Sequence, residues 1–479
     1  MKINWPTQIL LAALFLTGVT STAQVYNILH NFGSQFRDGT GPTTDLLLNS
    51  NTLYGATASG GTNFNGTIFK VNQDGSGYGL LLSFTDSAPT WGKMVLLGGT
   101  IYDTTWTGGA AANGSIFKIN IDGSGYTQLH AFSATIPSTF GTNYDGNRPR
   151  GGLAYDGTAL YGVAQYGGAF GNGTIFKINP DGSGFSIIKT FSATYLGTNN
   201  VSGNFLVTSG TNADGAYPIG SLVLDGSTLY GTTYKGGTSN GVVFAMQTDG
   251  SGFNVLKYFP STTGFGTNSD GAAPIAGLTL SGDTLYGATV GGGTNAGGTI
   301  FQIKTNGTVF KVVHDLAIND GMWPHNSLLL DGGTLYGTTA IGGVSNKGTI
   351  FMVLTNGENF TVLKHFDNTV SQCDSTFIVS SNTLYGTARS GGANGGGVVF
   401  GLKVLPQILN SSRFGIQSNA FGFDFTGISN QTVIVEAATN LSQPVWQPLQ
   451  TNTLIGAPQF FSDPQFNQRP KSFYRISSP

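Results

Sequence analysis

The sequence predicts an all-β protein: a seven-bladed β-propeller closed by its N-terminal strand and followed by a small C-terminal β-sandwich. Three observations predict this fold. A phrase of the type "LYGTT…GG…GTIF" returns seven times, each copy holds four short apolar runs, and the chain begins with a strand that the last copy lacks. Charged residues make up only 9% of the chain and aromatic residues 12%, whereas disordered chains have many charges and few aromatics. We therefore expect a folded, turn-rich chain.

The first 23 residues have the pattern of a secretory signal peptide. Lys2 supplies the positive charge, residues 9–19 are apolar, and "STA" (21–23) predicts cleavage after Ala23. An uncleaved anchor is the alternative, but the apolar run is short of the roughly 20 residues that span a bilayer. We expect a secreted or cell-surface protein with no transmembrane segment after cleavage. Cys373 is the only cysteine, so no intrachain disulfide can form.

The repeated phrase has two aromatic anchors, 15 residues apart in six copies and 14 apart in the fourth, with a Gly-Gly pair between them. The first anchor is the Tyr of "LYG", at Tyr54, Tyr102, Tyr161, Tyr230, Tyr286, Tyr336 and Tyr385. The second is the Phe of "GTIF" or "GVVF", at Phe69, Phe117, Phe176, Phe244, Phe301, Phe351 and Phe400. Such regular spacing is typical of repeat architectures.

One copy predicts a four-stranded antiparallel meander, whose strands we call a to d. In the sixth copy the apolar runs are 326–330, 334–339, 348–353 and 360–366. Asp-Gly and Asn-Gly turns separate the first two runs and the last two, and such residues tolerate the positive φ of tight hairpins. A lone sheet of this size cannot bury both faces, and radial repetition into a propeller solves that problem.

The ends of residues 24–404 predict how the ring closes. "VYNILHNF" (25–32) resembles the d strand "FTVLKHF" (360–366) but precedes any a, b or c strand. The last copy has no d strand, because "GVVFGLKV" (397–404) runs directly into "PQILN". We therefore expect the first strand to complete the last blade. An open β-solenoid is the alternative, and it leaves both ends unexplained.

The phrase "LYGTTxxGGxxxxGTIFKI" resembles the GloVer (Gloeo/Verruco) tandem repeat of secreted bacterial proteins, over about residues 25–404. The resemblance implies export and a propeller-like array, but no established chemistry and no catalytic residues. The second copy departs most, because Asp103 stands where Gly usually follows the Tyr.

Residues 405–479 break the repeat, and their alternating apolar segments predict a β-sandwich. The segment resembles a C-terminal module common on secreted repeat proteins. Surface attachment, sorting or a plain structural cap are all open as its role.

The loops between d and a strands carry a second motif, Asp-Gly-x-x-Pro, which predicts a ring of carboxylates at one mouth of the channel. Its aspartates are Asp38, Asp145, Asp214, Asp270 and Asp320, with Asp86 and Asp374 at equivalent places in imperfect copies. Asp, Gly and Pro at these positions also suit a purely structural turn. No cofactor is expected, and Ca²⁺ is the ion that a ring of carboxylates would suit.

Three long d–a loops, 133–144, 192–213 and 260–269, belong to successive copies and predict a binding face. Their aromatic, amide and hydroxyl side chains suit recognition of a polysaccharide or an extracellular protein. The candidate ligand-binding residues on this face are Trp91, Arg148, Arg150, Tyr217, Trp323 and His325. Each could instead pack between blades.

Several functions are disfavoured. The net charge of −2 gives no basic footprint for nucleic acid, and no HExxH, GxSxG or P-loop motif occurs. His30, His130, His314 and His365 fall in the outermost d strands, where we expect exposed rim positions. The sequence thus favours a monomeric, non-catalytic binding or cell-surface scaffold protein. The alternative is a carbohydrate-active hydrolase or lyase that uses a carboxylate at the channel mouth.

Overall fold

The structure, a computed structural model, is built from antiparallel β-sheets. It describes residues 24–34, 37–86, 92–136, 141–194, 211–262, 266–373, 375–418, 420–469 and 472–479. Within these residues the only helix is a 3-10 turn, η1 (Phe466–Gln468). None of the described helical segments has the length and apolar character needed to cross a bilayer.

The central hairpin of each repeat joins its b and c strands, as the sequence predicts. The b strands carry the Tyr anchor and are β4 (Thr52–Ser59), β8 (Thr100–Thr105), β13 (Leu160–Tyr166), β18 (Thr228–Lys235), β22 (Thr284–Thr289), β26 (Thr334–Thr339) and β31 (Thr383–Ala388). The c strands carry the Phe anchor and are β5 (Thr67–Asn72), β9 (Ser115–Asn120), β14 (Thr174–Ile178), β19 (Val242–Gln247), β23 (Thr299–Lys304), β27 (Thr349–Leu354) and β33 (Val398–Lys403).

Shorter strands flank each hairpin. The a strands are β3 (Leu47–Asn49), β7 (Val95–Leu97), β12 (Ala154–Tyr155), β17 (Val223–Asp225), β21 (Thr279–Ser281), β25 (Leu329–Asp331) and β30 (Ile378–Ser380). The d strands are β6 (Gly79–Ser83), β10 (Thr127–Ala131), β15 (Ser186–Thr190), β20 (Asn254–Tyr258), β24 (Lys311–Asp315) and β28 (Thr361–His365). Parts of the motif loops form β2 (Thr40–Pro42), β11 (Asn147–Pro149) and β16 (Ala216–Pro218). In the last repeat, β29 (Val370–Ser371), which precedes the a strand, pairs with β32 (Ser390–Gly391), which lies between β31 and β33.

The N-terminal strand β1 (Val25–Asn31) joins the last repeat. It pairs antiparallel with β33, with Val25 opposite Lys403 and Asn31 opposite Val398, and the sheet order is β1-β33-β31-β30. The strand missing from the end of the repeat region is thus supplied by its beginning, as the phase of the repeats predicts.

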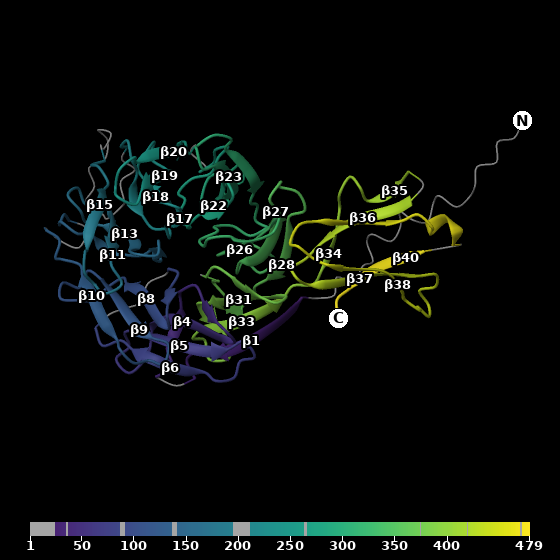
Figure 1. The fold of residues 1–479 in the computed structure, drawn as a ribbon, viewed down its shortest axis with the longest axis horizontal. Coiled ribbons are helices and arrows are strands. Elements are labelled where there is room, and N and C mark those ends of the chain that lie inside the picture. The colour runs from purple at the N-terminus through teal and green to yellow at the C-terminus, as the bar shows by residue number, and fades with distance from the viewer. Residues whose placement is uncertain are drawn as a thin grey trace, which may run out of the picture.

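The repeat sheets follow one another around a common centre, with β6, β10 and β20 at the periphery (Figure 1). Core clusters form between consecutive sheets. Tyr54 and Ile68 of one sheet, for example, pack with Ile101 and Phe117 of the next. Because each sheet buries its face against a neighbour, the two aromatic anchors lie in contact layers, and this explains why they recur at one spacing.

The C-terminal segment forms two smaller sheets around its own core. One holds β34 (Gln407–Leu409), β35 (Gly415–Gln417), β36 (Ala420–Thr426) and β39 (Gln459–Asp463), and the other holds β37 (Thr432–Ala438), β38 (Gln447–Thr453) and β40 (Phe473–Ser477). The core is Phe423, Phe425, Val433, Val435, Leu454 and Phe461. The segment is therefore built of antiparallel sheets, like the rest of the described chain.

The C-terminal sheets contact the turn between β25 and β26 (Figure 1). The amide of Ser429 donates to Asp331 Oδ2 at 2.6 Å, and the amide of Gly333 donates to the carbonyl of Gly456 at 3.0 Å. Thr334 Oγ1 donates to the same carbonyl at 3.2 Å. The contact lies on the sixth repeat, at the a–b turn.

Candidate functional site

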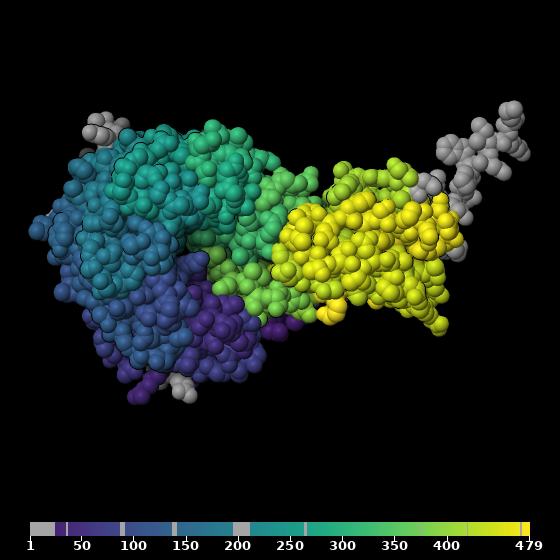
Figure 2. Space-filling view, in the orientation of Figure 1, coloured from purple at the N-terminus to yellow at the C-terminus, as the bar shows by residue number. Residues whose placement is uncertain are grey.

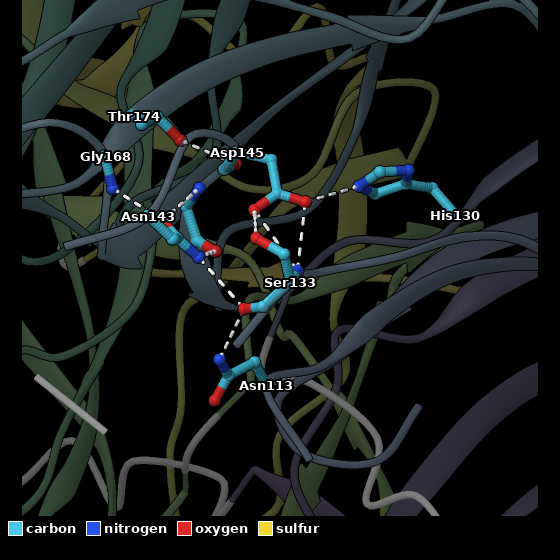
Figure 3. A network of polar contacts seen from close by, with 8 residues as sticks. Asn113, His130, Ser133, Asn143, Asp145, Gly168 and Thr174 are labelled. Carbon is cyan, nitrogen blue, oxygen red and sulfur yellow. Dashed lines mark hydrogen bonds and ion pairs between the residues drawn. The ribbon is translucent and has the colours of Figure 1, made fainter. Parts of the chain in front are cut away.

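The Asp-Gly-x-x-Pro aspartates bind the preceding d strand and its loop. Asp145 is fully buried, and its carboxylate accepts hydrogen bonds from the Ser133 amide (3.0 Å) and the Ser133 hydroxyl (2.5 Å) (Figure 3). His130 lies in β10, and its Nε2 is 3.1 Å from Asp145 Oδ2, the oxygen that also accepts from the Ser133 amide. These contacts join the motif to the preceding strand and supply hydrogen-bond partners to the buried carboxylate oxygens.

Other repeats use the same arrangement with His or Lys as the basic partner. The pairs are His30–Asp38 at 3.9 Å, Lys189–Asp214 at 2.6 Å, Lys257–Asp270 at 2.5 Å and His314–Asp320 at 3.1 Å. Burial works to raise the pKa of Asp270, but hydrogen bonds from Lys257 and Ser269 outweigh it and lower that pKa. The aspartates therefore face the outer strands of the array.

An aromatic ring from the next sheet covers each of these basic groups. The stacked or cation–π pairs are His30–Tyr78 (3.6 Å), His130–Phe185 (3.6 Å), His314–Phe360 (3.9 Å), Lys189–Phe253 (4.3 Å), Lys257–Phe310 (4.2 Å) and Lys364–Tyr26 (4.9 Å). Our expectation that His30, His130 and His314 are exposed rim residues is wrong. They are covered because each lies at a boundary between sheets, and burial lowers the pKa of His30 against the opposing effect of Asp38.

Asparagines two residues before the motif aspartates are also structural. Asn143 donates to the carbonyls of Ser133 (3.0 Å) and Gly146 (2.7 Å), and its Oδ1 accepts from the amide of Gly168 (2.8 Å) (Figure 3). Asn212 and Asn268 make equivalent bonds in the next two repeats. These amides, which the sequence suggested for ligand recognition, join two loops of the scaffold.

The structure thus corrects the predicted ring of carboxylates at the channel mouth. Asp38, Asp145, Asp214, Asp270 and Asp320 do not line the central cavity, because their partners lie in the outer strands. In the described part of the chain, no three His, Cys, Asp or Glu side chains are grouped as metal ligands. Binding of Ca²⁺ at these aspartates stays a prediction.

A cavity of about 270 Å³ lies among the innermost segments of the repeats. The face drawn in Figure 2 is hollowed between the purple, teal and green parts of the ring. The polar lining of the cavity includes Asp45, Arg150, His325, Asn326, Gln372 and Arg389. Most of these residues lie just after the motif proline, where each chain segment enters its a strand.

The cavity combines cationic groups with one described carboxylate. Asp45 Oδ1 accepts a hydrogen bond from the amide of Thr376 at 2.6 Å. Burial nevertheless raises the pKa of Asp45 above its usual value, against this bond and the charge of Lys93. Burial, with the nearby charge of Arg150, lowers the pKa of His325 to about 4. His325 is therefore neutral at pH 7.

The fourth residue of the motif adopts a left-handed backbone at the edge of this cavity. Its φ is 63° at Gly41, 56° at Arg148, 60° at Tyr217, 60° at Ala273, 62° at Trp323 and 58° at Gln372. This conformation is uncommon for residues other than glycine and stores strain. In return, the amides of Arg148 and Tyr217 donate to Asn113 and Asn172 of the preceding repeat, both at 2.8 Å.

On one side of the cavity, two of these positions and four residues at or just after the ends of b strands form a group that we call the rim: Trp106, Arg148, Tyr166, Tyr217, Tyr234 and Lys235. The Arg148 guanidinium lies 4.6 Å from the centre of the Trp106 ring. Tyr217 contacts Tyr166 edge to face at 5.4 Å, and Lys235 Nζ lies 4.7 Å from the Tyr234 ring. Burial raises the pKa of Tyr166, while the charges of Arg150 and Arg148 lower it. Arg148 stands two residues before Arg150, which lines the cavity, so the rim adjoins the cavity.

The predicted ligand-binding residues therefore lie in different parts of the structure. Arg150 and His325 line the cavity, Arg148 and Tyr217 belong to the rim, and Trp323 is 43% exposed at the equivalent place in the sixth repeat. Trp91 lies outside the described residues, as do parts of the three long loops, including 195–210.

Sequence reasoning missed Asp45, Arg389, Trp106 and Tyr234. A signal for three of them was present four residues after each Tyr anchor. That position holds Ala58, Trp106, Gln165, Tyr234, Val290, Ala340 and Arg389. The repeats are otherwise uniform, but this position varies from Ala to Trp and Arg. Such variation indicates that the surroundings of this position differ from repeat to repeat.

Fold and geometry define an all-β repeat protein with a cavity among its repeats. The chain belongs to the Gloeobacter/Verrucomicrobia repeat family, whose model matches residues 16–211 and 261–412. No curated protein matches the chain.

The chain is distantly similar to several solved structures. A chain of the nidogen/laminin complex is 15% identical, with a TM-score of 0.39, over 66% of this chain and 92% of that chain. The oligogalacturonate lyase of Vibrio parahaemolyticus is 10% identical, with a TM-score of 0.45, over 80% and 97%. TolB of Acinetobacter baumannii is 14% identical, with a TM-score of 0.36, over 61% of this chain but only 58% of its own.

Proposed function

We propose that this is an extracytoplasmic, non-catalytic binding protein that holds a polysaccharide or an extracellular protein at its central cavity and rim. In this proposal residues 1–23 direct export, residues 24–404 form a closed seven-bladed propeller with β1 as the closing strand, and residues 405–479 cap it or attach it to a surface. The mature protein is a monomer. The propeller supplies rigidity, and the ligand contacts come from residues that differ between repeats.

The observation that carries the proposal is the concentration of variation at the cavity. The outer boundaries between sheets repeat one arrangement, whereas the rim holds Trp106, Tyr166, Tyr217 and Tyr234 on one side only. Half-buried aromatic faces beside amide and hydroxyl groups are typical of binding sites for polar ligands. The rim also adjoins the repeats that carry the long loops 133–144 and 192–213.

Asp45 supports the second candidate function, a carbohydrate-active hydrolase or lyase. It is a single carboxylate in a cavity, with a raised pKa, and the neutral His325 lines the same cavity. Perturbed groups of this kind can act as general acid or base. Catalysis is less well supported than binding, because Asp45 is the only carboxylate among the described residues that line the cavity.

The test is a glycan and polysaccharide array probed with the secreted protein, followed by an assay for new reducing ends on every hit. We expect binding without release. Tyr217→Ala and Trp323→Ala should each weaken binding, whereas Tyr155→Ala, at the opposite end of its sheet, should not. Release of sugar ends that Asp45→Asn abolishes would replace binding by catalysis. Binding that survives both Tyr217→Ala and Trp323→Ala would show that another face is used.

A further inference from the structure

The strongest unexplained feature of the described residues is positive charge at the cavity and rim of a protein whose net charge is −2. Arg148 and Lys235 belong to the rim, and Arg150 and Arg389 line the cavity. The motif aspartates do not offset this charge, because they pair with the outer strands. The one described acidic residue in the lining, Asp45, lies within the electrostatic influence of Lys93.

Lys235 is the clearest case. It is half-buried at the end of β18, opposite Ala216 of β16, and its Nζ rests on the Tyr234 ring. No ion pair joins it to a carboxylate within the described residues. The neighbouring Asp214 is paired with Lys189.

We propose that the rim and cavity bind an acidic polysaccharide, with its anionic groups at Lys235, Arg148 and Arg150 and its sugar rings on Tyr217 and Tyr234. This inference rests on the proposed binding function and names the class of ligand. Aromatic faces stack on the apolar faces of sugar rings, while cations in a concave, partly dehydrated site attract carboxylate or sulfate groups.

The electrostatics of the site agree with an anionic ligand. Burial lowers the pKa of Lys235, which means that the fold holds its positive charge where water solvates it poorly. Such a charge destabilises the protein unless something else in the molecule requires it. An anion entering the site restores the lost solvation, and a neutral sugar does not.

The test compares three polymers with one backbone: dextran, carboxymethyl-dextran and dextran sulfate. Titration calorimetry on the full secreted chain should show binding of at least one charged polymer, at least about tenfold tighter than dextran, because a hydrogen bond to a charged group contributes about 1.5 kcal/mol and about 1.4 kcal/mol is a factor of ten. The affinity should fall as salt is raised. The carboxymethyl and sulfate arms identify the preferred anion.

Lys235→Gln should weaken binding of the charged polymer about tenfold and leave dextran binding unchanged, by the same conversion. Lys118→Gln, in the middle of β9, makes the same change of charge away from the rim and should have no effect. Arg150→Gln repeats the test in case Lys235→Gln does not fold.

Equal affinity for dextran and the charged polymers would overturn the anion inference while leaving the proposed binding function intact. Equal losses for Lys235→Gln and Lys118→Gln would overturn it too, since the charge effect would then not belong to the rim. Binding of none of the three polymers would overturn the anion inference, and no hit on the glycan array would also overturn the polysaccharide part of the proposed function.

Discussion

The outer boundaries between repeat sheets and the rim of the cavity are built from the same repeats but follow opposite rules. At the boundaries, one device recurs: a His or Lys in the d strand, an Asp in the following loop and an aromatic ring from the next sheet. By contrast, the position four residues after the Tyr anchor, which supplies Trp106 and Tyr234 to the rim, holds Gln165 and Ala340 in two other repeats. Positions that close the array are constrained by their neighbours, whereas positions facing the cavity are not. Repetition therefore marks the scaffold, and departure from it marks the site.

The largest expected effect is on a boundary. Asp145→Ala should lower the free energy of unfolding by about 3–5 kcal/mol, because it removes a fully buried carboxylate from its basic and hydroxyl partners. Asp181→Ala, at an exposed turn where Asp181 binds Ser183, should cost much less. Urea denaturation measures both. Equal losses would mean that the boundary device contributes no more than a surface turn.

The cavity should respond to pH through His325. Its pKa is about 4 in the folded chain against an ordinary 6.5, so the unfolded chain takes up the proton first as pH falls. Stability should therefore be full above about pH 6.5 and decline towards pH 4, by up to about 3 kcal/mol at about 1.4 kcal/mol per pKa unit. His325→Gln should remove this part of the decline. Parallel stability–pH curves for the two proteins would refute the assignment.

The Gly that follows the Tyr anchor tests the packing of the scaffold. A Cβ at Gly162 would lie 2.5 Å from the ring of Phe176 and 2.9 Å from Leu153. We expect Gly162→Ala to cost about 2 kcal/mol by overpacking. Gly79→Ala is the matched control, since its Cβ would meet only Lys70 at 3.7 Å. Thermal unfolding of both variants measures the difference, and similar melting temperatures would show that the sheet absorbs the methyl group.

A smaller effect should follow from loss of a covering ring. Phe185→Leu removes the ring stacked on His130 at 3.6 Å and should cost about 1 kcal/mol. The first repeat is a natural comparison, because Leu82 stands at the position of His130 there. In a His130→Leu background the cost of Phe185→Leu should shrink, and a double-mutant cycle by urea denaturation measures the coupling. Additive losses would mean that the stacked pair has no special interaction.

The smallest expected effect concerns metal. Because hydrogen bonds already occupy the boundary carboxylates, we expect EDTA to leave the melting temperature unchanged. A clear rise of the melting temperature on adding Ca²⁺ to the chelated protein would instead support the cation site that the sequence suggests.

Most of the repeat architecture followed from local patterns. The Tyr and Phe anchors, the Asp-Gly turns and the orphan strand 25–32 predicted the b–c hairpins and the pairing of β1 with β33. Strand alternation and turn chemistry act over a few residues, so a sequence displays them directly. The site was predicted less completely. Arg150 and His325 were found because they follow a visible motif, whereas Asp45 and Arg389 belong to repeats at opposite ends of the array and meet only in the fold.

The sequence by itself determined the repeat, its hairpins and the strand that completes the last sheet, because each depends on spacing within one copy or on the phase of the copies. The tertiary structure alone decided the direction of the motif aspartates. Asp145 faces outward because His130 precedes it in the d strand and Phe185 of the next sheet covers that histidine. The direction of Asp145 depends on three segments that meet only when consecutive sheets pack. As a result, the motif aspartates do not line the cavity, whereas Arg150 and Arg389 do.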